Sequence, residues 1–143
     1  MAVHLLKTAV GIADVASLQA RQAARAGQHG GRDVVFGYTR RRPTRADEVL
    51  DGGSIYWIIK GVICVRQRIL GLDEERDDEG KPFCLMVFDP ALIETAGLPR
   101  RAIQGWRYLR PDDAPPDLDG AGSAEDDALP PELARELREM GVV

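Results

Sequence analysis

The stretch Gly52–Leu70 reads GGSIYWIIKGVICVRQRIL and decides which fold is predicted for the chain. Its β-branched and aromatic residues favour extended structure, and Lys60-Gly61 suits a tight turn between two strands. A single helix is the alternative, because three apolar residues recur at helical spacing, namely Val62, Val65 and Ile69. We predict two strands, over residues 54–60 and 62–72.

Successive side chains on a strand point to opposite faces, so the same stretch predicts which residues are buried. The inward set is Ile55, Trp57 and Ile59 in the first strand and Ile63, Val65 and Ile69 in the second. Arg66 and Arg68 then share the outward face of the second strand. We therefore expect Trp57 in the core and two arginines on a solvated face.

The remaining segments complete the prediction of an α+β fold. Further strands are predicted over residues 2–10, 34–41, 81–88 and 101–109, with a helix at 14–26 begun by Asp14 and a helical turn at 44–50 begun by Thr44. We expect a mostly antiparallel five- or six-stranded sheet, or a partly closed small β-barrel, with short flanking helices. The predicted units are a globular domain (1–110), a Pro- and Asp-rich linker (111–129) and a short C-terminal helix (130–143).

Composition is that of an ordinary soluble protein, but charge is distributed unevenly. The 143 residues are 44% hydrophobic and 29% charged, and no apolar run approaches the roughly 20 residues of a membrane span. Residues 1–109 hold 16 basic and 13 acidic side chains, a net +3, whereas residues 110–143 have a net −7. Two cysteines are too few for a disulfide framework, so we expect a cytoplasmic protein without a membrane segment.

Most catalytic and cofactor chemistries lack a matching pattern in this sequence. Two histidines and two cysteines do not combine at metal-ligand spacing, so no metal is predicted. Neither G-x-x-x-x-G-K-[ST] nor G-x-G-x-x-G is present, and Ser54 does not lie in a G-x-S-x-G turn. We therefore predict no cofactor and favour a binding module over an enzyme.

Arginine and aromatic residues concentrate near two stretches and form the candidate ligand-binding set. A guanidinium pairs with phosphate and an open aromatic ring stacks on a base, so the combination suits nucleic acid. The candidate residues are Arg40, Arg66, Arg68, Gln104, Trp106, Arg107 and Tyr108. The competing interpretation, which residue burial statistics favour, is core tryptophan beside solvated arginines that pair with acids. If both tryptophans are buried, the aromatic part of the hypothesis loses its basis.

Three stretches resemble a known family: GGSIYWIIKG, the Arg66–Leu70 run RQRIL, and IQGWRYLRPDDAPPDL. They are similar to a bacterial family of unknown function, family 1489, found mainly in alphaproteobacteria. The resemblance covers most of residues 2–118, omits the tail from Asp119, and implies no catalytic residue. A weaker similarity in element order links the predicted fold to small β-barrels of the PUA, ASCH and EVE group, which implies RNA or a modified nucleotide as partner.

Three functional hypotheses arise from these observations. The leading one is non-enzymatic binding of nucleic acid or a nucleotide-like ligand by the candidate residues above. The second is a protein-interaction or assembly factor, in which the acidic tail and the C-terminal helix dock on a protein partner. The third is a small enzyme with Lys60 or Tyr56 as acid or base, for which the sequence supplies no matched partner spacing. The oligomeric state is not predicted.

Overall fold

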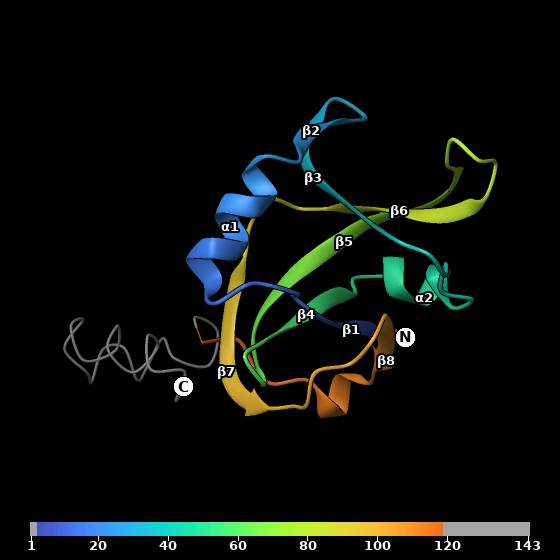
Figure 1. Ribbon diagram of the computed structural model, residues 1–143. Helices are drawn as coiled ribbons and strands as arrows, with labels where there is room; N and C mark the ends of the chain where they lie inside the picture. Colours follow the sequence, from blue (N-terminus) through green and yellow to red (C-terminus); the bar gives the residue numbers. More distant parts are fainter. Residues whose placement is uncertain (1–2, 119–143) are drawn as a thin grey trace.

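In the computed structural model, which describes residues 3–118, eight strands join in one mixed sheet (Figure 1). The strands are β1 His4–Thr8, β2 Ala26–His29, β3 Arg32–Thr39, β4 Ser54–Ile59, β5 Val62–Arg76, β6 Pro82–Phe88, β7 Ile93–Pro99 and β8 Trp106–Leu109. The helices are α1 Val15–Ala23 and α2 Ala46–Leu50, and η1 Pro111–Asp113 is a 3₁₀ turn. A sheet-dominated α+β arrangement is thus confirmed.

Strand β5 is the longest strand and connects the two ends of the sheet. The strand order is β2-β3-β6-β5-β4-β1-β8, with β7 paired to β5 outside this path. The first part of β5 pairs with β4 and β7, and its second part pairs with β6. Strands β1 and β4 run parallel, whereas the other named pairs are antiparallel.

Two parts of the fold prediction need correction. Residues 3–118 contain eight strands rather than five or six, and the sheet is mixed. The sheet also stays open within these residues, because β2 and β8 lie at opposite ends of the strand order and do not pair with each other. A closed barrel would need that pairing to remove both edges.

The segment at the centre of the sequence forms two strands joined by a tight turn, as predicted. Lys60 and Gly61 both have positive φ angles, 50° and 77°, which a two-residue hairpin turn of type I′ requires. Glycine adopts this conformation without steric cost, so the Lys60-Gly61 dipeptide fixes where the chain reverses. The second strand continues to Arg76, four residues beyond the predicted end at residue 72.

The two faces of the hairpin are buried against different clusters. Ile55, Trp57 and Ile59 enter the large core cluster, which also contains residues of α1 and α2. Tyr56 and Ile58 belong to a smaller cluster on the opposite face, called the second face below. Ile63 also belongs to this smaller cluster, and not with Val65 and Ile69 as predicted. The pairing of β5 shifts register between Ile63 and Val65, which breaks the simple alternation.

Helix α1 is fixed to the sheet through a buried pair of amides. Gln22 and Gln67 each donate to the other's amide oxygen at 2.8 Å. The Trp57 indole N–H donates to the same Gln67 oxygen at 3.2 Å, so the buried ring has its polar atom satisfied. At the helix start, Asp14 accepts from the Ser17 N–H at 2.7 Å, which confirms the predicted N-cap. Helix α2 instead begins after Arg45, not Thr44, and has no side-chain cap bond.

The sequence did not reveal β2 and β7. Neither segment was among the predicted strands. Strand β2 reads AGQH and pairs only with β3, and β7 reads IETAGLP and pairs with β5. Neither segment has an apolar/polar alternation that would predict a strand. Each is a strand because its backbone pairs with one neighbouring strand.

The first part of the predicted linker packs on the sheet. Residues 111–117, called the strap below, follow β8 and cross the second face. Thr95 and Asp117 form a β-bridge, the Ala96 N–H donates to the Pro116 carbonyl at 2.8 Å, and Ala114 packs against the second-face cluster. The remaining linker, 119–129, and the predicted helix at 130–143 lie outside the described residues. No helix within residues 3–118 has the length and apolarity needed to cross a bilayer.

Candidate ligand-binding surfaces

The structure separates the predicted site residues into groups. Gln104 precedes β8, which carries Trp106, Arg107 and Tyr108. Arg66 and Arg68 lie on β5, and the strands β4 and β1 separate β5 from β8. At about 4.8 Å per strand, this places the two groups about 14 Å apart across the sheet. Arg40 immediately follows β3.

Trp106 is a core residue, which removes the open stacking face expected from the sequence. Only 4% of its surface is exposed, and its indole N–H donates to the Arg41 carbonyl at 2.7 Å. The Arg41 guanidinium lies 4.3 Å from the ring centroid, a cation–π distance. Lys7 of β1 is paired with both Trp106 and Trp57, so the two tryptophans share the face that packs into the large core. Trp57, at 8% exposed, is buried as predicted.

Tyr108 plays the same part for Arg45, at the other end of the loop. Its ring packs edge-on against Trp106, with centroids 4.8 Å apart, and its hydroxyl accepts from the Arg45 backbone N–H at 3.0 Å. The Arg45 guanidinium lies 5.3 Å from the ring centroid and also pairs with Glu48 at 2.6 Å. The two aromatic residues of β8 therefore hold the 41–45 loop and fix where its arginines leave the surface.

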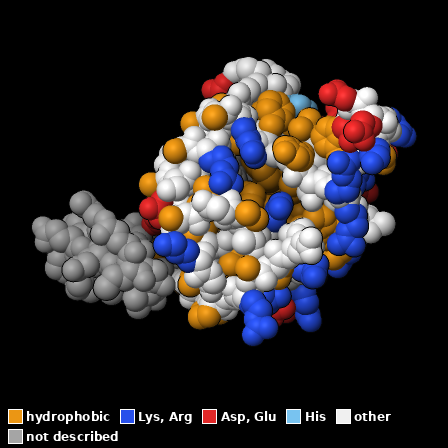
Figure 2. All heavy atoms as spheres, viewed as in Figure 1, with side chains coloured by type: hydrophobic (Ala, Val, Ile, Leu, Met, Phe, Trp, Pro, Cys, Tyr) orange, Lys and Arg blue, Asp and Glu red, His pale blue; other side chains and the backbone are white. Residues whose placement is uncertain are grey.

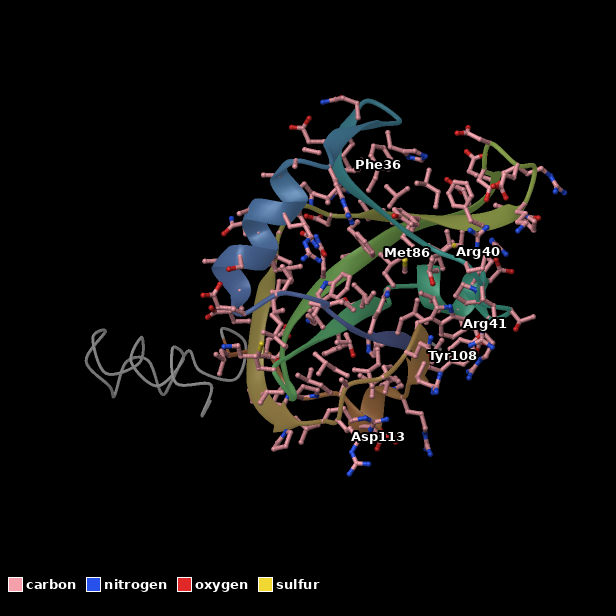
Figure 3. All side chains as sticks on the ribbon, in the orientation of Figure 1. Phe36, Arg40, Arg41, Met86, Tyr108 and Asp113 are labelled. Carbon is pink, nitrogen blue, oxygen red and sulfur yellow. The ribbon has the colours of Figure 1, made fainter. Side chains whose placement is uncertain are left out.

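These arginines belong to a continuous basic surface along one side of the molecule. We call Arg41, Arg42, Arg45 and Arg107 the arginine ridge; all four are exposed. Figure 2 shows Lys and Arg side chains following one another down the side where α2 and β8 lie, and Figure 3 labels Arg40, Arg41 and Tyr108 there. Within residues 3–118, no acidic side chain forms an ion pair with Arg41, Arg42 or Arg107.

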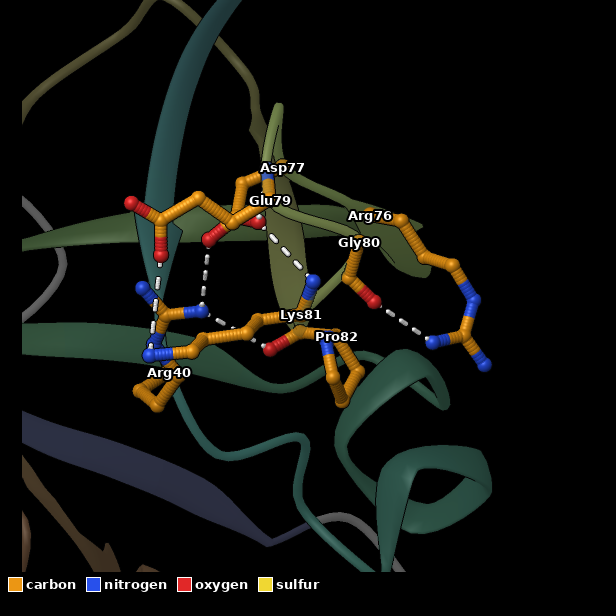
Figure 4. Close-up of polar contacts among 7 residues, drawn as sticks. All are labelled: Arg40, Arg76, Asp77, Glu79, Gly80, Lys81 and Pro82. Carbon is orange, nitrogen blue, oxygen red and sulfur yellow. Dashed lines mark hydrogen bonds and ion pairs between the residues drawn. The ribbon is translucent and has the colours of Figure 1, made fainter.

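Arg40 has a different role, because it is bound to the turn between β5 and β6 (Figure 4). Its guanidinium donates to Asp77 at 3.3 Å and to the Pro82 carbonyl at 3.0 Å. Asp77 also accepts from the backbone N–H groups of Glu79 and Lys81 at 3.0 and 2.9 Å. The bond from the Lys81 N–H is the main cause that lowers the pKa of the Asp77 carboxyl. Arg40 thus helps to hold the turn between β5 and β6.

A second site lies on the second face, where residues of the sheet and of the strap line an open pocket of about 350 Å³. His4, Tyr56 and Arg66 line it from three strands, and Asp117 lines it from the strap. Arg66 pairs with both oxygens of Asp117 at 2.6 Å and donates to the Ser54 hydroxyl at 2.9 Å. Arg66 is therefore a partner of the strap, whereas Arg68 is exposed and lies outside the pocket.

His4 is held neutral in this pocket. The Ser54 backbone N–H donates to His4 Nδ1 at 3.0 Å, so the ring proton of the neutral form must be on Nε2. Burial is the main cause that lowers the pKa of His4, with the Arg66 charge second. Burial likewise raises the pKa of the neighbouring Tyr56 hydroxyl; the two rings meet edge to face with centroids 5.0 Å apart.

Sequence reasoning missed this pocket because its residues are distant in the chain. Tyr56 was considered only as an isolated acid or base, and His4, Ser54 and Asp117 were not assigned to a site. Their positions share no spacing, and strand pairing alone makes them neighbours: Leu6 is paired with Tyr56, and Tyr56 with Arg66. Within residues 3–118, no three potential metal ligands lie close enough together to hold an ion.

These features define a small sheet-rich α+β protein with a basic edge and a polar pocket. The chain belongs to the family described as protein of unknown function (DUF1489), whose model matches residues 5–143. This confirms the resemblance noted in the sequence and extends it, because the match includes the tail that had been left out. No curated protein and no solved structure matches the chain. The similarity to the PUA, ASCH and EVE barrels therefore has no support from these comparisons.

Proposed function

We propose that the protein is a non-enzymatic binding module and that its arginine ridge binds single-stranded nucleic acid through the phosphate backbone. The observation that carries this proposal is that Arg41, Arg42 and Arg107 have no ion-pair partner within residues 3–118. Arg42 Nε donates to the Leu72 carbonyl at 2.8 Å, a neutral acceptor that leaves its charge uncompensated. A charged group that already has an ion-pair partner must lose it before it binds phosphate. An unpaired, exposed guanidinium binds without that cost.

The aromatic residues have a changed role in this proposal. Because Trp106 is buried, it does not stack on a base; it accepts the Arg41 guanidinium on its ring and binds the Arg41 carbonyl. Tyr108 holds Arg45 in the same way. Affinity then comes from phosphate contacts, so we expect little dependence on base sequence and a strong dependence on salt. Gln104, exposed beside β8, is the remaining candidate for contacting a base edge.

The test is fluorescence anisotropy of the full chain with labelled single-stranded RNA and DNA of mixed sequence. The expected result is binding that weakens steeply between about 50 and 200 mM salt. The double variant Arg41→Gln/Arg107→Gln should bind about tenfold more weakly at low salt and show a smaller salt slope.

Arg25→Gln is the matched control, because Arg25 is also exposed, has no acidic partner within residues 3–118, and lies over a tyrosine ring at 5.9 Å. Removing its charge should change affinity by less than about twofold, since Arg25 lies over Tyr38 of β3 and not over the β8 rings that hold Arg41 and Arg45. Absence of salt-sensitive binding, or equal losses in the control and the ridge variant, would contradict the proposal.

A further inference from the structure

The pocket under the strap presents hydrogen-bond donors that nothing in the described chain uses. Its volume, about 350 Å³, is at the lower end of the range for small-ligand pockets. His4 Nδ1 is engaged by the Ser54 N–H, which leaves the Nε2–H without a partner among residues 3–118. The first donor of the pocket is therefore an uncharged imidazole N–H.

Tyr56 supplies the second donor. Its residue is 5% exposed, and within residues 3–118 its hydroxyl makes no hydrogen bond. No fully buried side-chain oxygen or nitrogen in the described chain lacks a partner, so this hydroxyl must reach the pocket, where Tyr56 is part of the lining. Because burial keeps the phenol protonated, it donates as well as accepts.

Arg66 is the third donor and the only cation among the described residues that line the pocket. A guanidinium has five N–H groups in a fixed plane, and the bonds to Asp117 and Ser54 engage its Nε, Nη1 and Nη2 atoms once each. One hydrogen on each Nη remains. Donor groups from β1, β4 and β5 thus line one pocket. The pairing with Asp117 shows that this guanidinium donates to the oxygens of an anion.

We propose that this pocket is a binding site for a small oxoanion of the phosphate-monoester class, bound by His4 Nε2–H, the Tyr56 hydroxyl and Arg66. A planar carboxylate is satisfied by the Arg66 fork alone, as Asp117 demonstrates. A tetrahedral phosphate offers further oxygens in other directions, which suits three donor groups on three strands. The proposal does not depend on the arginine ridge.

Asp117 is the internal competitor of such a ligand. It lies on the strap and neutralises Arg66 in the absence of a ligand, with its side chain 28% exposed and that of Arg66 22% exposed. A phosphate must therefore share or displace this carboxylate. Removing the charge of Asp117 should strengthen anion binding, which is the opposite of what loss of a mere structural ion pair would do.

The experiment is isothermal calorimetry of the full chain with inorganic phosphate, supported by the ¹⁵N signals of the His4 ring. We expect Asp117→Asn to bind phosphate about fivefold or more tightly than the original chain, and Tyr56→Phe about fivefold or more weakly. Tyr38→Phe is the matched control, because Tyr38 is 66% exposed on β3; its affinity should not change. Binding should move the His4 Nε2 signal in each folded variant.

Further arms separate the sources of the phosphate and the two surfaces. A ribose phosphate that binds more tightly than inorganic phosphate assigns the site to a metabolite, whereas tighter binding of a 5′-phosphorylated oligonucleotide than of its unphosphorylated form assigns it to a strand end. In either case Arg41→Gln/Arg107→Gln should leave inorganic phosphate binding unchanged, even if the ridge binds no nucleic acid. The proposal is overturned if neither the original chain nor Asp117→Asn binds phosphate, if Tyr56→Phe binds equally well, or if acetate binds as tightly as phosphate.

Discussion

The arginine ridge and the strap pocket combine arginine with aromatic residues in opposite ways. On the ridge the aromatic rings are occupied by contacts within the protein. Trp106 is 4% exposed, and the rings of Trp106 and Tyr108 hold Arg41 and Arg45. The arginines remain exposed, and three of them are unpaired within residues 3–118. In the pocket the arginine is engaged by Asp117 and Ser54, whereas the Tyr56 hydroxyl has no hydrogen-bond partner within residues 3–118.

The difference shows that residue type alone does not determine which group is available to a ligand. Arg41, Arg42 and Arg107 have no acidic partner within residues 3–118, so their charge is available to a long anion whose contacts are many and weak. Arg66 is compensated, so its pocket suits a small ligand that replaces a specific set of hydrogen bonds. Substitutions in one region at a time test this difference, each against a matched residue elsewhere in the chain.

The largest effect is expected for Trp106→Ala. Loss of a buried tryptophan from the large core should lower the free energy of unfolding by about 3–5 kcal/mol, measured by urea unfolding of the full chain. Trp106→Phe fills most of the space but leaves the Arg41 carbonyl without the indole donor, and should cost about 1–2 kcal/mol. This milder variant should weaken binding on the ridge and leave phosphate binding in the pocket unchanged.

Tyr38→Ala serves as the reference, since a ring that is 66% exposed contributes little burial and should cost less than about 1 kcal/mol. If Trp106→Ala were no more destabilising than Tyr38→Ala, Trp106 would not be the core residue that holds the ridge.

An intermediate effect is expected when Arg66 loses its pairing with Asp117. Arg66→Gln leaves the half-buried Asp117 carboxylate poorly compensated and detaches one fixing point of the strap, so the free energy of unfolding should fall by about 1–3 kcal/mol. Arg40→Gln is the comparison, because the Arg40–Asp77 pair has side chains 65% and 31% exposed and should contribute less than the Arg66–Asp117 pair. Urea unfolding measures both, and equal losses would show that burial does not distinguish the two pairs.

The smallest effect concerns pH and the neutral His4. Its pKa in the folded chain lies below the ordinary value of 6.5, and protonation would oppose the Ser54 N–H that points at Nδ1. Below pH 6.5 the unfolded chain therefore binds a proton at His4 more readily than the folded chain does. The contribution of neutral His4 to the free energy of unfolding is full above pH 6.5 and is lost as pH falls toward the folded pKa. The melting temperature should decline less between about pH 7.5 and 5.5 in His4→Gln than in the original chain.

Tyr56, Arg66 and Asp117 are the titratable groups that face His4. Among the four residue types, only histidine has an ordinary pKa within this pH range. His29→Gln, which replaces the exposed histidine of β2 near Asp73, is the comparison variant. A steeper decline in His4→Gln would mean that the protonated ring is accommodated in the pocket.

Much of the sheet could be predicted where side-chain pattern and turn chemistry agree. Ile55, Trp57 and Ile59 alternate with Tyr56 and Ile58, and the Lys60-Gly61 pair has the left-handed angles that the hairpin needs. Where the pattern was absent, prediction failed: β2 and β7 exist through backbone pairing, and the register shift after Ile63 moved that residue to the second face. Neither a backbone hydrogen bond nor a bulge leaves a trace in residue type.

The candidate sites were less predictable than the fold. The concentration of arginine and aromatic residues near β8 was visible in the sequence, but the exposure of each side chain was not. Trp106 was expected to be open and is buried, since it shares the core face with Trp57 through their common neighbour Lys7. The segment 111–117 was assigned to a linker, and the hydrogen bond from Ala96 and the ion pair of Asp117 are long-range contacts that composition does not report.

The sequence by itself determined the local decisions: a hairpin at Lys60-Gly61, the alternation of buried and outward residues, the N-cap at Asp14, and a basic body beside an acidic tail. These depend on neighbouring residues, whose periodicity and turn chemistry are written in order along the chain. Only the tertiary structure decided that His4, Tyr56, Arg66 and Asp117 meet in one pocket and that Trp106 supports arginines rather than a base. Strand order and register set those encounters, and both depend on contacts between segments far apart in the chain.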